Sequence, residues 1–137
     1  MRSSAASDVY KRQEFRPNNK DGYKFKKSYP YPTGENTLGL NCLNDCNFNY
    51  PSKYSKFLLR GYGHVSTFST KKGINGLYDM GGNVWEWVDI NDNSYKGTKG
   101  GSWWYGKNKM IKTYIATKPK NMSALYIGFR CVKDFKN

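Results

Sequence analysis

The clearest alternation of apolar and polar residues lies near the middle of the chain, at residues 84–88. The run Val-Trp-Glu-Trp-Val repeats with a period of two, which predicts a short β-strand. Val84, Glu86 and Val88 then share one face of the strand, and the two tryptophans share the other. We expect the face that carries Glu86 to point inward.

A carboxylate buried between two valines needs a partner, because an unpaired buried charge costs several kcal/mol, roughly. Two alternatives are open for Glu86. The first is a structural salt bridge with Arg130. The second is a site for a hard metal ion, in which Asp79 and Glu86 converge with carbonyl groups of the bend that Gly81 and Gly82 permit.

Periodicity elsewhere is weak, and long helical patterns are hard to find. One short helix is predicted at Lys53–Arg60, where the glycines that follow would end it. The remaining pattern predicts two further strands, at His64–Phe68 and Tyr126–Val132, a turn at Pro30–Gly34 and a solvated loop at Asn91–Lys99. The second of these strands reads as buried, with Gly128 permitting close approach of a neighbour. Together with 17% aromatic residues, this indicates an irregular, loop-rich α+β fold with short antiparallel strands and few helices.

The ends and the length of the chain bound its organisation. With 137 residues the chain is at most one domain. Residues 1–13 lack the apolar core of a signal peptide, and we expect them to be a non-native leader derived from cloning sequence. No apolar run approaches the length that a bilayer requires, so we expect no membrane span.

The net charge of +13 raises the possibility of nucleic-acid binding. The 18 lysines far outnumber the 5 arginines, and no basic run exceeds two residues. Few arginine side chains are therefore present to read phosphate in a bidentate manner. We consider a nucleic-acid partner unlikely.

Two of the three cysteines, Cys42 and Cys46, are four positions apart. With a single histidine in the chain they do not make a zinc site, which needs four closed ligands. A disulfide between them is geometrically open, but the separation of their Cα atoms decides it. Two free thiols, as in a reducing cell, are the default expectation.

Three blocks of the sequence resemble the formylglycine-generating enzyme family, also called sulfatase-modifying factors. They are GLYDMGGNVWEWVD at residues 76–89, KGGSWWYG at 99–106 and YIGFRCV at 126–132, and they follow the order of the family. The resemblance covers Lys24–Asn137. It implies a fold related to C-type lectins, and it implies that residues 14–137 are the C-terminal portion of a single larger domain of this kind.

The resemblance also implies calcium binding at the central block. Carried over by position, Asp79 and Glu86 would supply carboxylates, and Gly82 and Val84 would supply backbone oxygens. Calcium accepts irregular sets of oxygen ligands, so we expect a structural calcium ion here. Asn41 matches the asparagine of a further calcium site in the family.

In the catalytic members of the family, two cysteines follow the Gly-Gly-Ser motif at three and eight positions. They bind copper as thiolates, which suits Cu(I), and oxidise a substrate cysteine with dioxygen. Counted from Ser102, these positions hold Tyr105 and Met110. We therefore expect no copper and no catalytic residue, and we expect Gly100, Gly101 and Arg130 to be structural. Cys131 resembles a packing residue of the family.

Adjacent tryptophans in a strand point to opposite faces, so one of Trp103 and Trp104 should lie in the core. In the family this region borders the substrate groove, and Trp103, Trp104 and Tyr105 could wall a groove for a peptide or a sugar. Packing alone would also explain them. The interpretation is a non-catalytic, calcium-stabilised binding or structural module; the alternative is a formylglycine-generating oxidase, or another oxidoreductase of the family, that acts on a protein cysteine.

Overall fold

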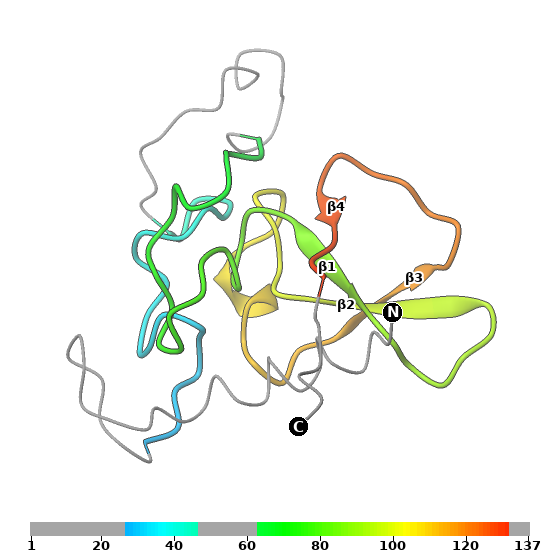
Figure 1. The fold of residues 1–137 in the computed structure, drawn as a ribbon, viewed down its shortest axis with the longest axis horizontal. Coiled ribbons are helices and arrows are strands. Elements are labelled where there is room, and N and C mark those ends of the chain that lie inside the picture. The colour runs from blue at the N-terminus through cyan, green and yellow to red at the C-terminus, as the bar shows by residue number, and fades with distance from the viewer. Residues whose placement is uncertain (1–26, 47–62, 132–137) are drawn as a thin grey trace.

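The computed structural model describes residues 27–46 and 63–131 (Figure 1). Along the chain the elements are β1 (Trp85–Val88), β2 (Tyr95–Lys99), the 3-10 helix η2 (Lys107–Lys109), β3 (Ala116–Pro119) and β4 (Ile127–Gly128). In these two ranges η2 is the only helical element. The helix expected at Lys53–Arg60 lies outside the described residues.

The four strands form one sheet in the order β3-β2-β1-β4. β1 and β3 both pair with β2 in antiparallel fashion, as expected. The expectation of antiparallel pairing is wrong for β4, which runs parallel to β1. A parallel neighbour needs a long connection, and here that connection runs from β1 through β2 and β3 before the chain sweeps round to the far edge of β1 (Figure 1).

β1 covers four of the five residues at which the alternation predicts a strand. Glu86 and Val88 are buried, at 4% and 2% exposure, so this face points inward as expected. The opposite face of β1 is covered as well at Trp85, whose side chain is only 1% exposed. The rings of Tyr105 and Tyr114 cover it at centroid distances of 5.5 and 6.1 Å.

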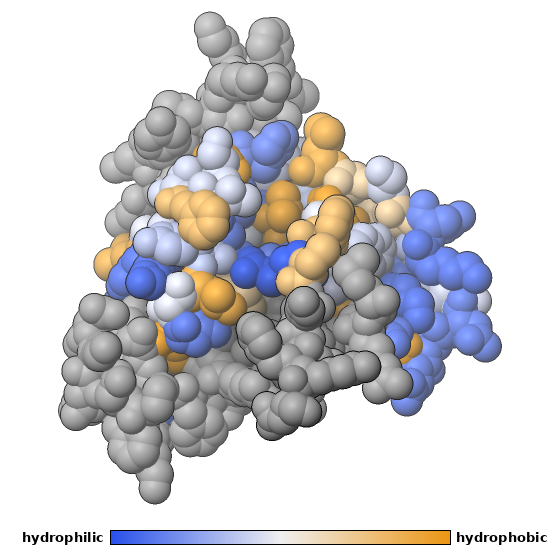
Figure 2. All heavy atoms as spheres, in the orientation of Figure 1, coloured by the Kyte–Doolittle hydropathy of each residue, from blue (hydrophilic) through white to orange (hydrophobic). Residues whose placement is uncertain are grey.

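The expectation of a loop at residues 91–99 is wrong for its second half, which forms β2. Sheet context overrides the polar sequence here, because β2 lies between β1 and β3 and is hydrogen-bonded on both sides. The turn that precedes β2 is closed by Asp92, whose Oδ1 accepts the N–H groups of Ser94 and Tyr95, both at 2.8 Å. These two donors lower the pKa of the Asp92 carboxyl. Figure 2 shows hydrophilic surface over this loop and apolar patches nearer the centre of the molecule.

Residues 64–68 do not form the predicted strand. The backbone of Val65 pairs with a side chain instead of a strand. Asn83 Oδ1 accepts a hydrogen bond from the Val65 N–H at 2.9 Å, and Asn83 Nδ2 donates to the Val65 carbonyl at 3.2 Å. One amide therefore supplies the pair of hydrogen bonds that a neighbouring strand would otherwise supply.

The strand predicted at 126–132 is limited to the two residues of β4 in the described part of the chain. It is half-buried rather than buried, because β4 is an edge strand, and Phe129 just after it is 74% exposed. Gly128 does permit a close approach: a Cβ atom there would lie 3.0 Å from Val84 Cγ2. None of the described segments forms a helix that could cross a bilayer.

Candidate functional site

The bend before β1 is fixed by the backbone of Gly82. Its φ is +73°, and a Cβ atom there would lie 2.4 Å from the Asn41 carbonyl oxygen, so no other residue fits without displacement. The Gly82 N–H donates to the Gly100 carbonyl at 2.7 Å. The bend thus joins the block around Asn41 to the Gly100–Gly101 block.

Asn83 extends this connection and was not singled out by the sequence analysis. Its N–H donates to the Asn41 carbonyl at 2.8 Å, and its side-chain oxygen accepts from Asn41 Nδ2 at 3.3 Å. Asn41 Nδ2 also donates to the Gly63 carbonyl at 2.9 Å. A short polar residue between a Gly-Gly pair and a strand was the available signal, because asparagine adopts a positive φ readily, here +60°.

The salt bridge between Glu86 and Arg130 is present. Arg130 Nε lies 2.8 Å from each carboxylate oxygen, and Nη2 lies 2.5 Å from Oε1. Nη2 also donates to the carbonyls of Tyr78 and Asp79, both at 3.1 Å. The Glu86 side chain is 6% exposed and that of Arg130 is 25% exposed. A single guanidinium therefore ties β1, the bend and the segment after β4 together.

The Asp79 carboxylate braces a neighbouring segment. Its Oδ1 accepts from the Thr70 hydroxyl at 2.7 Å, and its Oδ2 accepts from the Phe68 N–H at 3.0 Å. Asp79 itself has a φ of +57°. Both oxygens of this carboxylate thus accept hydrogen bonds from residues 68–70.

Three of the residues expected to hold calcium, Asp79, Val84 and Glu86, line one cavity. Their donor atoms are oxygens, which suits a hard cation. Each Asp79 oxygen accepts one of the hydrogen bonds above and keeps a second lone pair, whereas Glu86 Oε1 already accepts from both Nε and Nη2 of Arg130. No three His, Cys, Asp or Glu side chains gather as a metal site in the described ranges. An ion here would consequently depend on backbone carbonyls as well as on Asp79 and Glu86.

The further expected ligand, Asn41, carries an unusual atom. Its side-chain oxygen Oδ1 is buried and has no hydrogen-bond partner within the described residues. A buried carbonyl oxygen of this kind is costly unless something pairs with it, and a cation is one such partner. By donor type, Asn41 fits the ligand role that the resemblance implies.

The two adjacent tryptophans divide between core and surface, as expected. Trp103 is 1% exposed, and Trp104 is half-buried. They lie in a turn rather than a strand, and the Tyr105 N–H closes this turn by donating to the Ser102 carbonyl at 3.1 Å. The turn, not strand pleating, directs the two side chains, and their rings meet edge-on at a centroid distance of 5.1 Å.

Trp104 and Tyr105 belong to an aromatic cluster at the surface. The Tyr126 ring lies 5.7 Å from that of Trp104 and 5.8 Å from that of Tyr105. Burial, followed by the nearby Tyr105, raises the pKa of the Tyr126 hydroxyl. Lys118 Nζ lies 5.4 Å from the centroid of the Tyr105 ring, so an ammonium group borders the aromatic surface.

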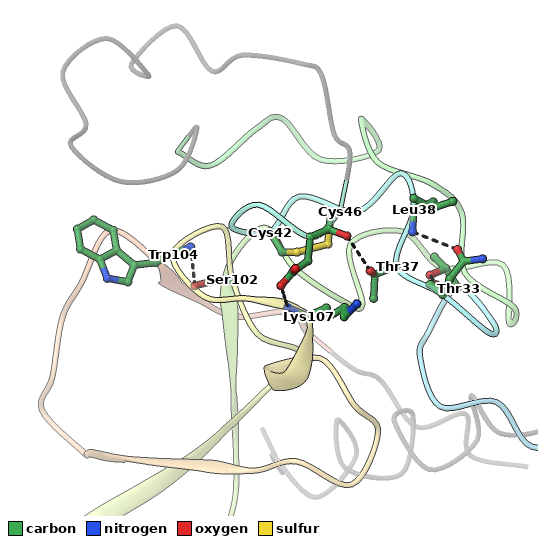
Figure 3. The surroundings of a disulfide bond; sticks show 10 residues. Thr33, Thr37, Leu38, Cys42, Cys46, Ser102, Trp104 and Lys107 are labelled. Atoms are coloured by element: carbon green, nitrogen blue, oxygen red, sulfur yellow. Dashed lines mark hydrogen bonds between the residues drawn. A yellow bond between two sulfur atoms is a disulfide. The ribbon is translucent and has the colours of Figure 1, made fainter.

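The cysteines are paired differently from the default expectation. Cys42 and Cys46 form a disulfide across a Cα separation of 5.5 Å, so the expectation of free thiols is wrong. The turn between them brings the Cα atoms within the usual range for a disulfide. Hydrogen bonds from the Thr37 hydroxyl and the Lys107 N–H to Asp45 flank this turn (Figure 3).

Met110 packs against this disulfide. It is 1% exposed and shares a core cluster with Leu40, Cys42 and Cys46. A Cβ atom on Gly101, whose φ is +70°, would lie 2.6 Å from Met110 Cγ, so the glycine makes room for the thioether. Cys131, expected to be a packing residue, is exposed instead, and it lies three residues beyond the edge strand β4.

The family model for the sulfatase-modifying factor enzyme 1-like domain matches residues 11–135. The chain belongs to this family. In this sulfatase-modifying-factor domain the glycine bend, the Gly100–Gly101 block and the Arg130 segment meet around β1. The match begins inside the stretch that we expect to be a leader. No curated protein gives a significant match to the chain.

Proposed function

We propose that this sulfatase-modifying-factor domain is a non-catalytic module that binds a peptide or a carbohydrate and is stabilised by calcium. Its relation to C-type lectins is part of the same proposal. The alternative is a formylglycine-generating oxidase, or another oxidoreductase of the family, that acts on a protein cysteine.

One observation carries the non-catalytic proposal: the positions that would hold copper thiolates are occupied by packing side chains. Met110 is buried against the Cys42–Cys46 disulfide. The ring of Tyr105 is held edge-on by Trp85 and Tyr126. A phenol and a buried thioether do not supply the pair of soft thiolates that Cu(I) requires.

A pair of neighbouring cysteines outside the two expected copper positions could in principle supply thiolates, so the state of Cys42 and Cys46 bears on this proposal. Cys42 and Cys46 do lie together, but as a disulfide with 4% and 0% exposure. In Figure 3 the disulfide lies away from the half-buried ring of Trp104. A closed, buried disulfide offers no thiolate to an open groove, so this pair supports a structural role rather than an oxidase site.

Binding is supported by the surface around Trp104. The half-buried Trp104 ring contacts the Tyr126 ring, which in turn contacts the Tyr105 ring. The ammonium group of Lys118 lies over the Tyr105 ring, at the border of this cluster. Aromatic rings with a polar group at the edge are typical of ligand sites, because they combine a large apolar area with orientation.

The catalytic alternative is tested by incubating the full-length protein with a Cys-x-Pro-x-Arg peptide, copper and oxygen. We expect the peptide mass to stay unchanged. A family member that has both cysteines serves as the positive control in the same buffer. Conversion of the cysteine to formylglycine, detected by mass spectrometry, would overturn the non-catalytic proposal.

The calcium proposal is tested by thermal unfolding with calcium, with magnesium and with EGTA. At a calcium concentration 100 times its Kd the ion would add about 2.7 kcal/mol of stability, and magnesium would add less because it demands a stricter octahedron. Asp79→Asn should weaken the calcium effect, whereas Asp92→Asn, in the exposed β1–β2 turn, should leave it intact. An unchanged melting temperature in EGTA would show that no such site exists.

A further inference from the structure

The residues around the bend enclose a cavity of about 420 Å³. This volume falls within the range of about 300–1,000 Å³ that is usual for small-ligand sites. The cavity shares no residue with the Trp103–Tyr105 surface. Its walls combine apolar and charged side chains, including Phe68, Lys72, Leu77, Tyr78, Phe129 and Arg130.

Phe68 stands at this cavity in a conformation that stability alone does not favour. Its φ is +67°, which a bulky residue rarely adopts, and its side chain is 73% exposed. Its N–H is held by the Asp79 carboxylate, and its ring meets Tyr78 edge-on at 5.3 Å. A strained backbone that presents an apolar ring to solvent is a feature of ligand-contact sites.

The strain is concentrated at this cavity. Four non-glycine residues of the described chain have a positive φ, and three of them, Phe68, Asp79 and Asn83, line it. Two further apolar residues that line the cavity are exposed to solvent: Phe129 is 74% exposed and Leu77 is 40% exposed. Large apolar side chains thus surround the opening, where a partner could cover them.

The charged groups of the cavity wall are two carboxylates, Asp79 and Glu86, and two cations, Lys72 and Arg130. Glu86 is paired with Arg130, and both oxygens of Asp79 accept hydrogen bonds from residues 68–70. Lys72 lines the cavity without an ion pair to any described residue. In a chain with a net charge of +13, an anionic group placed at Lys72 is the complementary partner for this side of the cavity.

We propose that this cavity binds an acidic peptide segment of a partner protein. One aromatic or large aliphatic side chain of the peptide lies between Phe68 and Phe129, and a neighbouring carboxylate pairs with Lys72. A peptide fits better than a small acid, because a chain that continues past its anchor covers the exposed rings at the opening. This pocket is additional to the aromatic surface in the proposed function.

The proposal is tested by selecting from a randomised heptapeptide display library against the full-length protein. The affinities of the enriched peptides are then measured by fluorescence anisotropy. Enriched peptides should carry one large apolar residue flanked by Asp or Glu. Phe68→Gly should weaken their binding by at least about tenfold without lowering the melting temperature, because glycine adopts the positive φ freely. Loss of binding without loss of folding separates a ligand role from a structural one.

Matched controls come from neighbouring positions. Phe129→Ser should weaken binding, whereas Leu125→Ser, at a residue that is 71% exposed but outside the cavity, should not. Lys72→Glu should abolish binding, and Lys71→Glu, with the same change in charge, should reduce it less than about twofold.

Three outcomes would overturn the proposal: no enriched peptide, a preference for neutral or basic peptides, or equal effects of Phe68→Gly and Leu125→Ser. None of these outcomes bears on the oxidase or calcium tests, so failure of this inference is distinguishable from failure of the proposed function.

Discussion

Two neighbouring regions are stabilised by different interactions: the glycine bend with its Glu86–Arg130 ion pair, and the sulfur cluster formed by Leu40, Cys42, Cys46 and Met110. In the bend, Glu86 and Arg130 make several directional polar contacts, and Gly82 fits closely against Asn41. In the sulfur cluster, Met110 is held by apolar packing, and Cys42 and Cys46 are joined by a disulfide bond. A site built from backbone carbonyls persists as long as the bend persists. A thiolate site depends on two side-chain atoms, so packing residues can replace it and leave the fold intact.

The largest expected effect tests how tightly the bend fits. Gly82→Ala should destabilise the domain by roughly 4 kcal/mol, because the strain of a positive φ adds to overpacking against Asn41. Gly76→Ala is the matched control: its φ is +84°, but the nearest atom to its Cβ would be Lys72 Cε at 3.7 Å. It should cost about 1 kcal/mol. Equal losses in urea unfolding would show that the close fit of the bend is unimportant.

Removal of the guanidinium tests the ion pair itself. Arg130→Ala should cost about 3 kcal/mol, because it removes the guanidinium that pairs with the buried Glu86 carboxylate. Lys96→Ala removes the exposed pair with Asp89, at 2.9 Å, and should cost under about 1 kcal/mol.

The double variant Arg130→Met/Glu86→Gln should recover part of the loss in a double-mutant cycle. No recovery would mean that the bonds from Arg130 to the carbonyls of Tyr78 and Asp79 account for its contribution.

A smaller effect is expected in the sulfur cluster. Cys42→Ser/Cys46→Ser should lower stability by about 2 kcal/mol, because the disulfide closes only a short loop. A reductant should lower the melting temperature of the wild type and leave that of the double variant unchanged. Cys131→Ser, at the exposed free cysteine, should have no effect in either condition. A drop as large as that for Gly82→Ala would erase the contrast between the two regions.

The smallest expected effect is a change in stability at alkaline pH, and it arises from Tyr126 in the aromatic cluster. Burial raises the pKa of Tyr126, so the folded chain holds this proton more tightly than the unfolded chain, whose tyrosines titrate near about 10. The resulting stabilisation is present below that pH and is lost as pH rises through the folded pKa. The urea midpoint should therefore fall less steeply above pH 10, roughly, in Tyr126→Phe. Tyr95→Phe, at a 47% exposed residue, should follow the wild type.

The sequence predicted those parts of the fold that a single local pattern specifies. The alternation at residues 84–88 specified β1, and the proline-rich turn is closed by hydrogen bonds in both directions between Tyr31 and Gly34, at 3.2 and 3.0 Å. A charge between two valines indicated that Glu86 needs a partner, and the salt bridge with Arg130 was one of the two alternatives that it left open. Each of these features depends on residues whose preferences act over a few positions.

Other parts depended on distant partners and were predicted wrongly. β2 forms from a polar sequence because strands on both sides pair with it. β4 is parallel because of a crossover that no local pattern encodes. The Cys42–Cys46 disulfide depends on a Cα separation that spacing alone does not give. The cavity beside Phe68 was missed because its residues come from two distant parts of the chain, 67–86 and 129–130.

Asn83 shows that a side chain can replace a strand. With both of its amide atoms engaged by Val65, a segment of irregular backbone gains a defined register without belonging to the sheet. Asn83 therefore anchors the start of the stretch that carries Phe68, and Asp79 holds its end. Exchange of the amide nitrogen for an oxygen, as in Asn83→Asp, would replace a donor with an acceptor opposite the Val65 carbonyl and free the start of that stretch while every strand stayed paired.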